Sequence, residues 1–300
     1  MDFKDIRLKE LLNIKDDREA LTHGGRFHAD DVFAAALLKL IKPDIQIKRI
    51  NTLPKMYDGL IFDIGFGEYD HHQKNKRVRA NGIHFAAFGL LWEKLGAPMV
   101  GEKIAESFDR NFVEKIDYTD NSGKSNLISE AINDFNPSWN EDNNYDKCFE
   151  EAVSFAAGVL KRRIEKEIRN EAAKEEIHNL LKNNTDKCVV LDRPMPWKSV
   201  LVGTDTEFVI FPSARGGYMI QTVPISNEEL TPVVEFPYEW YGADAETLRR
   251  ISGVKTFTFC HSTGYIASAG SLEDARKIVN ISKENATAKK CKSSMVLLQT

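Results

Sequence analysis

Histidine and aspartate residues gather in four short segments in the first half of this 300-residue sequence. Five of the seven histidines fall between residues 23 and 84. The segments that carry the pattern are THGGRFHADD (22–31), LIFDI (60–64), DHH (70–72) and DYTDNSG (117–123). Neutral imidazole and carboxylate groups together bind divalent cations such as Mn, Fe or Zn. The sequence therefore predicts a metal site.

The elements around these segments would bring them to one edge of a sheet. A predicted strand at 19–23 leads through a glycine-containing turn into a predicted helix at 30–41, and a second strand covers 60–64. The carboxyl ends of parallel strands meet at the same edge, where sites form. The ligand candidates that this edge would gather are His23, His28, Asp30, Asp63, Asp70, His71 and His72.

The number of candidates indicates the kind of site. A structural zinc site uses four ligands, usually including thiolates. The four cysteines, at 148, 188, 260 and 291, form no CxxC pair and lie outside the cluster. Six or seven imidazole and carboxylate candidates fit two metals that share a carboxylate. Two such metals, about 3.5–4 Å apart, activate water and neutralise an attacked phosphate.

At these residues the sequence resembles the DHH phosphoesterase superfamily, and more closely the melanocyte-proliferating-gene family of metal-dependent hydrolases. The motifs that carry the resemblance are THGGRFHADD (22–31), FDIGFGEYDHHQ (62–73), RANGIHFAAFGLLW (79–92) and FVEKIDYTDNSG (112–123). The stretches ARGGYMIQTVP (214–224) and FCHSTGYIASAGSLEDA (259–275) are similar in style. The likeness therefore spans nearly the whole chain.

The resemblance implies a dinuclear site, usually manganese in relatives, in a cleft between two domains. The ligands it implies for one metal are His23, His28 and Asp63. Those it implies for the other are Asp30, Asp63, His71 and an aspartate of the DYTDNSG stretch. Asp63 would then bridge the two metals, and His72 would face the phosphate.

Two departures from the superfamily pattern bear on these roles. His28 stands where aspartate is common, and the added imidazole also allows iron or zinc. Asp117 and Asp120 both fit the last ligand position. Asp120 is preferred, with Asp117 as the alternative or as a residue that orients a histidine.

Basic residues follow the histidines directly, at Lys74, Lys76, Arg77 and Arg79. In an acidic protein this placement fits a phosphate-bearing substrate, although each charge could equally belong to a solvated loop. Arg79, beside Asn81 and Gly82, is the strongest candidate for a catalytic or substrate-binding role.

Further substrate-binding residues are predicted in the second half. Arg215 precedes Gly216 and Gly217, which would let the backbone approach a ligand closely. His261 and Ser262 form a predicted polar turn between a strand and a helix, where N–H groups would hold a phosphate. A surface histidine is the alternative for His261.

The whole pattern predicts an α/β fold with two domains, since a domain averages about 150 residues. Residues 1–184 would form a metal-binding catalytic domain with a parallel sheet, flanking helices and a long final helix at 147–183. Residues 185–300 would form a smaller α/β substrate-binding domain. The other elements expected are strands at 45–50, 187–191, 200–202, 207–211, 217–223 and 254–260, and helices at 85–95, 100–116, 244–250 and 271–281.

Composition narrows the class of protein. Hydrophobic residues make up 42% and charged residues 29%, which excludes wholesale disorder. Lys+Arg 41 against Asp+Glu 45 gives a net charge of −4 and excludes a polycation. No stretch approaches the roughly 18 apolar residues of a membrane span, and the acidic N-terminal region lacks a targeting pattern. We expect a cytoplasmic protein with no membrane partner, and an organellar location stays open.

These observations predict a hydrolase, namely a metal-dependent phosphodiesterase with a two-metal mechanism. The resemblance implies 3′-to-5′ exonuclease action on RNA or short oligonucleotides. The expected partner is therefore a phosphate-bearing substrate such as single-stranded RNA. The sequence leaves open whether the protein forms a homo-oligomer. A pyrophosphatase or a hydrolase of cyclic or other small nucleotides is the alternative on the same site. A non-catalytic metal-binding module is the second alternative.

Overall fold

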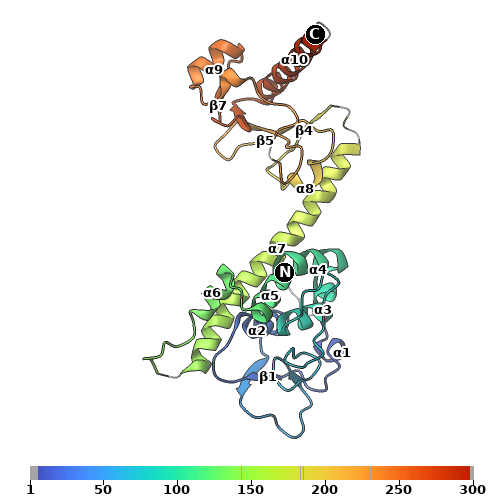
Figure 1. The fold of residues 1–300 in the computed structure, drawn as a ribbon, viewed down its shortest axis with the longest axis vertical. Helices are drawn as coiled ribbons and strands as arrows, with labels where there is room; N and C mark the ends of the chain where they lie inside the picture. Colours follow the sequence, from blue (N-terminus) through green and yellow to red (C-terminus); the bar gives the residue numbers. More distant parts are fainter. Residues whose placement is uncertain (1–5, 143, 183, 185, 230, 298–300) are drawn as a thin grey trace. The chain divides into compact units, whose positions relative to one another are not determined.

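A long helix carries the chain from one compact unit into a second. The computed structural model describes the backbone of residues 6–142, 144–182, 184, 186–229 and 231–297, with side chains up to residue 289. The units are Met1–Arg169 and Asn170–Thr300, and the division falls inside α7 (Tyr145–Lys182) (Figure 1). Each unit buries its own hydrophobic residues.

Unit 1 contains a three-stranded parallel sheet with the order β2-β1-β3. Its strands are β1 (Glu19–His23), β2 (Gln46–Ile50) and β3 (Leu60–Ile61). Helix α2 (Ala29–Ile41) connects β1 to β2, whereas a loop connects β2 to β3. The predicted parallel sheet with helices is confirmed. Strand β3 is shorter than expected because the chain turns at Asp63, whose φ of 55° is left-handed.

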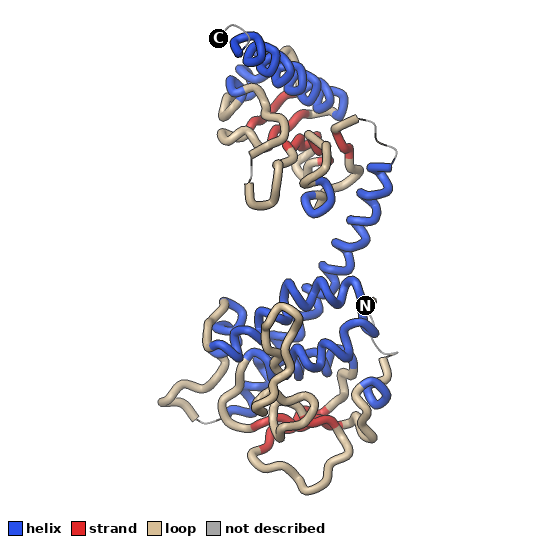
Figure 2. The backbone as a smooth tube through the Cα atoms, turned by 45° about the vertical axis from the view of Figure 1, so that its right-hand side comes forward, coloured by secondary structure: helices blue, strands red, loops and turns tan. Residues whose placement is uncertain are grey.

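The remaining helices of unit 1 gather on one side of the sheet in both views (Figures 1 and 2). They are α3 (Ala87–Val100), α4 (Glu102–Phe108), the π-helical turn η1 (Asp109–Val113), α5 (Glu114–Ser122) and α6 (Leu127–Asn133), with the short α1 (Leu8–Leu11) nearer the chain start. Helix α3 runs past Gly96, where it was expected to end. The helix expected to end at 116 continues through η1 into α5, so the DYTDNS residues are helical.

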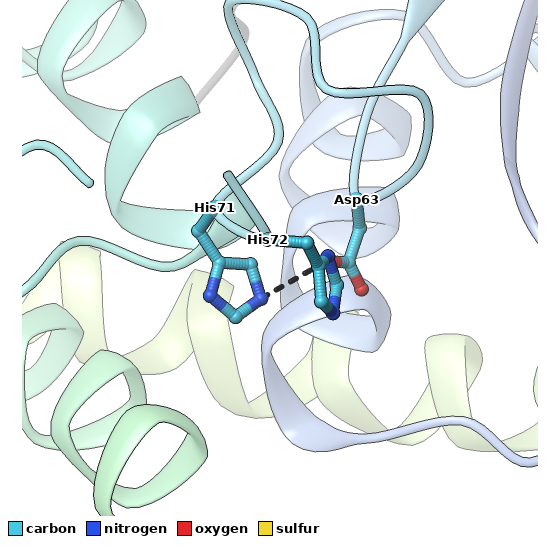
Figure 3. Close-up of side chains that lie close together, drawn as sticks. All are labelled: Asp63, His71 and His72. Carbon is cyan, nitrogen blue, oxygen red and sulfur yellow. Dashed lines mark ion pairs between the residues drawn. The ribbon is translucent and has the colours of Figure 1, made fainter. Parts of the chain in front are cut away.

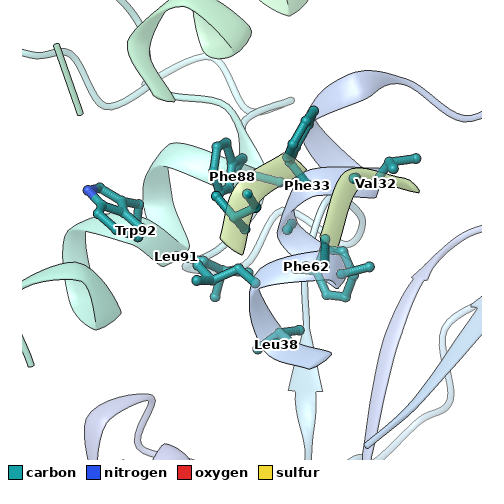
Figure 4. Packing of buried hydrophobic residues seen from close by; sticks show 14 of the residues in the cluster. Val32, Phe33, Leu38, Phe62, Phe88, Leu91 and Trp92 are labelled. Carbon is teal, nitrogen blue, oxygen red and sulfur yellow. The ribbon is translucent and has the colours of Figure 1, made fainter. Parts of the chain in front are cut away.

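The core of unit 1 forms where α2 packs against α3 and the sheet (Figure 4). Nearly every residue of α2 is buried, because the helix lies between the strands and the other helices. Aromatic rings interlock across this interface: Phe33 lies 5.6 Å from Phe88 and 5.3 Å from Phe112, between ring centroids. This packing fixes the N-terminal end of α2, which carries two acidic residues, Asp30 and Asp31.

Unit 2 is also α/β, with a five-stranded sheet in the order β4-β5-β6-β8-β7. Its strands are β4 (Cys188–Val190), β5 (Phe208–Pro212), β6 (Tyr218–Thr222), β7 (Phe257–Cys260) and β8 (Ile266–Ala269). Its helices are α8 (Lys198–Leu201), η2 (Tyr238–Trp240), α9 (Ala245–Ser252) and α10 (Leu272–Leu297). Strands β4 and β5 are parallel and the other pairs antiparallel.

Two expectations for the second half were wrong. Residues 200–202 were expected to be a strand, but Val200 and Leu201 belong to the short helix α8. Strand β8 was not expected, because its sequence IASA consists mainly of small residues with weak strand preference. As a result, the turn at His261 connects two strands and not a strand to a helix.

Two further sequence expectations concern thiols and membranes. Cys148, Cys188 and Cys260 are free thiols, and the side chain of Cys291 lies outside the described residues. Among the helices in the described ranges, none is both long and apolar enough to cross a bilayer.

Replacing Phe88 by alanine tests the packing of α2 against α3. We expect Phe88→Ala to lower the free energy of unfolding by about 3–5 kcal/mol, because it removes a fully buried ring and leaves a cavity. Urea denaturation followed by fluorescence measures the loss. Met56→Ala, at an exposed position, is the control and should change stability by less than about 0.5 kcal/mol.

Candidate metal centre

Two of the candidate ligands come from the carboxyl ends of neighbouring strands, and others come from the helix that follows the first strand. His23 is the last residue of β1, and Asp63 follows β3, which pairs with β1 in parallel. The pairing continues past β3, since the Phe62 amide donates to the Leu21 carbonyl at 3.0 Å. Asp30 and Asp31 belong to the first turn of α2, where the helix dipole favours carboxylates.

The turn between His23 and α2 is held from both sides. Gly25 has a φ of 74°, which a glycine adopts without strain. Arg49 of β2 donates to the Gly25 carbonyl. The buried Asn136 side chain accepts from the Phe27 amide at 3.1 Å and donates to the Phe27 carbonyl at 3.0 Å. The turn therefore presents His23 and His28 from a fixed backbone.

Asp70 organises the DHH segment without joining the cluster itself. Its buried carboxylate accepts from the Phe66 amide at 2.6 Å and from the His72 amide at 3.1 Å. It also accepts from Nδ1 of His72 at 2.7 Å. Because Nδ1 is held by Asp70, the His72 ring can offer Nε2 to a ligand.

His23 forms the first part of the cluster. Its Nε2 lies 3.2 Å from Asp31 Oδ2 and 3.3 Å from Asp63 Oδ2. Burial alone would lower the pKa of His23, but the contacts with both carboxylates outweigh it and raise the pKa to about 10. Asp63 responds in the opposite sense: burial opposes ionisation, yet contacts with the two histidines at its sides lower its pKa to about 2.

His71 forms the second part of the cluster, on the other oxygen of Asp63 (Figure 3). Its Nε2 lies 3.1 Å from Asp63 Oδ1, 3.3 Å from Asp120 Oδ2 and 3.6 Å from Asp30 Oδ2. The Asp63 carboxylate thus lies between the two histidines, with one oxygen toward each. Asp63 therefore connects the two parts of the cluster.

Several oxygens of the buried carboxylates have no hydrogen-bond partner among the described residues of the protein. Asp30 Oδ1, Asp31 Oδ2 and Asp63 Oδ1 are buried and have no hydrogen-bond partner among the described residues, although the latter two have ion-pair contacts. Burial and the neighbouring carboxylates raise the pKa of Asp30 well above its ordinary value. Bound cations would satisfy these oxygens and offset the repulsion, so the residues present fit a metal site.

Three groups of ligand atoms lie close enough to hold a cation. They are His23–Asp31–Asp63, Asp63–His71–His72 and His28–Asp30–Asp120. The structure therefore brings every predicted ligand except Asp70 into one cluster. It groups His28 with Asp30 and Asp120, whereas the resemblance implied a set of His28 with His23 and Asp63. Asp31 was missed, because an acidic residue at a helix start has an ordinary explanation in the helix dipole. The doubled aspartate after His28 was the available signal.

The structure separates the roles of the two aspartates on α5. Asp120 lies 3.3 Å from His71, within the cluster. Asp117 instead contacts Arg79 at 2.8 Å through Oδ2 and accepts from the Gly89 amide at 3.1 Å through Oδ1. Burial raises the pKa of Asp117 to about 7, although Arg79 opposes this shift. Asp117 therefore joins α5 to α3, while Asp120 faces the candidate metals.

Arg79 occupies a different environment from the one expected of a phosphate-binding residue. Its side chain is 7% exposed and lies over the Phe85 ring, 3.9 Å from the ring centre. It donates to both oxygens of Asp109 at 2.7 and 2.8 Å and contacts Asp117. Two carboxylates thus already neutralise the guanidinium, which favours a role in positioning α5 over the expected contact with substrate.

The residues predicted to bind substrate in unit 2 fall into two separate places. Arg215, Gly216 and Gly217 precede β6, whereas His261 and Ser262 precede β8, which runs antiparallel to β6. The two turns lie at opposite ends of the sheet, about 10 Å apart over three residue steps. One phosphate group cannot contact both.

Contacts within the protein bear on the predicted roles of residues in both turns. A Cβ at Gly217 would lie 2.4 Å from the Ala269 carbonyl oxygen, so glycine is needed there for packing within the protein. The predicted close approach of a ligand at Gly217 stays a prediction. His261 accepts from the Thr263 amide at 3.2 Å within its turn. This turn leads into β8, so the expectation that it precedes a helix is wrong. The predicted role of His261 and Ser262 in binding substrate stays a prediction.

Comparison with known proteins identifies the family. A sequence model of the MYG1 exonuclease family, described as uncharacterised protein family UPF0160, matches residues 19–282, and the chain belongs to this family. The MYG1 protein YER156C of Saccharomyces cerevisiae is 26% identical over 90% of this chain and 97% of its own length. The MYG1 protein of Chlamydia trachomatis is 26% identical over 88% and 96%. The Homo sapiens protein named MYG1 exonuclease is 24% identical over 85% and 82%.

Metal binding should depend on Asp63. We expect Mn²⁺ to raise the melting temperature by about 5 °C or more and EDTA to reverse the rise, because cations offset buried negative charge. In Asp63→Asn this rise should disappear, and elemental analysis should find less bound metal. Asp58→Asn, an exposed residue of the preceding loop, is the control and should behave as wild type. Equal metal content in Asp63→Asn and wild type would contradict the assignment.

The two aspartates of α5 should give opposite results. Asp120→Asn should weaken Mn²⁺ binding by at least about tenfold while leaving the metal-free protein as stable as wild type. Asp117→Asn should cost about 3 kcal/mol of stability, because it removes one of the two carboxylates at the buried Arg79, and should keep the metal content. Calorimetric titration and urea denaturation measure the two effects, and a reversed pattern would assign Asp117 as the ligand.

Proposed function

We propose that this protein is a metal-dependent phosphodiesterase that acts as a 3′-to-5′ exonuclease on RNA or short oligonucleotides. The observation that carries the proposal is the Asp63 carboxylate lying between His23 and His71. Relatives from Rattus norvegicus and Homo sapiens are named MYG1 exonuclease, which supports a nuclease. The proposal includes membership of the DHH superfamily, with a catalytic domain at 1–184 and a substrate-binding domain at 185–300.

The proposed cofactors are two divalent cations, with manganese preferred over iron or zinc. Asp63 would contribute to both positions. The other residues that would hold the cations are His23, Asp31, His28, Asp30, His71 and Asp120. Divalent cations at such a site lower the pKa of water toward about 7 and neutralise charge on the phosphoryl oxygens.

The chain itself supplies groups for the substrate. His72 is half exposed, and its Nδ1 is held by the buried Asp70. Nε2 of the neutral ring would therefore accept a proton, and Nε2 of the protonated ring would donate to a phosphate oxygen or to the leaving group. Lys76 lines the same cavity as His72 and adds a positive charge for the substrate backbone. In unit 2, His261 and Ser262 remain proposed substrate contacts, and Arg215 with Gly216 forms a second, separate one.

The two proposed catalytic groups can be tested with matched variants. We expect Mn²⁺-dependent release of nucleoside monophosphates from single-stranded RNA, with Asp63→Asn inactive and His72→Asn slowed about a hundredfold in kcat. Asp44→Asn, on an exposed loop, is the control and should keep wild-type activity. Orthophosphate released from pyrophosphate, without nucleotides from RNA, would indicate a pyrophosphatase. Full activity of Asp63→Asn would refute the proposed mechanism.

A further inference from the structure

Three adjoining pockets begin at the candidate metal centre and follow α5 and α6 of unit 1. The first has a volume of about 550 Å³ and is lined by His71 of the cluster. The second, of about 380 Å³, shares Thr119 and Ser125 with the first. The third, of about 620 Å³, shares Lys115 and Asn126 with the second. Because neighbouring pockets meet at shared side chains, they form one continuous groove, which we call the α5 groove.

The charge of the lining residues becomes more positive along the α5 groove with distance from the metal centre. The first pocket has one lysine against two carboxylates. In the second, Lys115 and Lys124 face one carboxylate, that of Glu114. Among the described residues that line the third pocket, Lys115 and Arg163 are basic and none is acidic. In a protein whose net charge is −4, this local excess of cations favours an anionic ligand.

Two of these cations keep their donors available for a ligand. Lys115 and Arg163 are exposed, and neither side chain forms an ion pair or a hydrogen bond with another residue that the structure describes. The Arg163 guanidinium lies over the buried Phe112 ring, 4.5 Å from the ring centre, and this contact holds it at the wall of the groove. A guanidinium held by stacking still offers its N–H groups in the plane, where they can bind a phosphate.

An aromatic ring lies beside the cations in the second pocket. Tyr118 lines this pocket and is 39% exposed, and the Lys124 ammonium lies 5.6 Å from the centre of its ring. Ile83 adds an apolar side chain to the same wall. An exposed ring can stack on a nucleobase of any sequence, while a nearby ammonium contacts the phosphate. Because the bases of a duplex already stack on one another, this combination favours a single strand.

We propose that the α5 groove binds the body of a single-stranded nucleic acid whose terminal phosphodiester lies at the metal centre. Lys124, Lys115 and Arg163 contact backbone phosphates beyond the cleavage site, and Tyr118 stacks on one base. The inference rests on the proposed function and adds a binding surface for the nucleotides that are not being cleaved. Each further nucleotide of the strand reaches further cations, so affinity increases with the length of the substrate.

Substrate length tests the groove in the active protein. With Mn²⁺, the KM for a single-stranded hexanucleotide should be at least about tenfold below that for a dinucleotide, which is too short to reach the cations. The double variant Lys115→Gln/Arg163→Gln should raise the KM for the hexanucleotide about tenfold and leave kcat and the dinucleotide KM unchanged. Lys55→Gln/Lys147→Gln removes two exposed charges that do not line the groove and is the matched control.

The stacking role of Tyr118 has its own pair of variants. Tyr118→Leu should weaken hexanucleotide binding about tenfold, because stacking of a base on an aromatic ring contributes about 1–3 kcal/mol. Tyr118→Phe keeps the ring and should bind as wild type does. Fluorescence anisotropy of the labelled strand measures both, and equal loss in the two variants would refute stacking.

Binding without hydrolysis separates this inference from the proposed function. The probe is a labelled hexanucleotide whose 3′-terminal linkage is a nuclease-resistant methylphosphonate, with Mn²⁺-saturated protein. Lys115→Gln/Arg163→Gln should reduce the slope of log Kd against log salt concentration by about 1.4, because each phosphate contact of a single strand contributes about 0.7. If this change is found but no phosphodiester is cleaved, the proposed function fails and the α5 groove stands.

Two other outcomes overturn the inference alone. If the protein cleaves both substrates and the double variant keeps the wild-type KM values and salt dependence, the groove does not bind the strand. If a duplex of the same sequence or a polyglutamate peptide competes as well as the single strand, the surface binds polyanions without selecting single strands. Circular dichroism of each variant shows that the fold is intact, so loss of folding is not confused with loss of binding.

Discussion

The main physical constraint on unit 1 is a group of buried carboxylates that have too few positively charged partners within the protein. Asp30, Asp31 and Asp63 are nearly inaccessible to solvent. Asp31 contacts His23, Asp30 contacts His71, and Asp63 contacts both histidines. In the protein alone, the imidazoles in contact with Asp63 are His23 and His71, at 3.3 and 3.1 Å, and more distantly His72, at 3.7 Å. Such an arrangement is costly for folding and becomes favourable when cations bind, so stability and function draw on the same residues.

The scaffold around the cluster uses buried polar contacts to fix each element that contributes a ligand. Asn136 holds the turn before α2, and Asp70 holds the DHH loop. The ion pairs of Arg79 with Asp109 and Asp117 connect η1 and α5 to the start of α3. These contacts act at different places on the chain, and together they set the distances between ligands that are far apart in the sequence.

The sequence predicted the parallel sheet of unit 1 and the residues that gather at its edge, because strand alternation and the doubled acidic and histidine motifs are local signals. It did not predict how the ligands would be divided among the three groups of ligand atoms. The groups that contain His28 and Asp31 depend on the backbone conformation of the turn between β1 and α2. It also could not show that Arg79 would be buried between carboxylates, because Asp109 and Asp117 lie 30 and 38 positions away in the chain. Strand β8 was not predicted because its small side chains show no clear alternation of apolar and polar residues.

The left-handed backbone at Asp63 gives this position a second requirement beyond its charge. Aspartate and asparagine tolerate a φ of 55° better than most residues, since their short polar side chains bond locally. Alanine scanning at this position would therefore combine backbone strain with the loss of a ligand and overstate the chemical contribution of the carboxylate. Asparagine keeps the conformation and most of the shape, which makes the amide the cleaner probe of what the negative charge does.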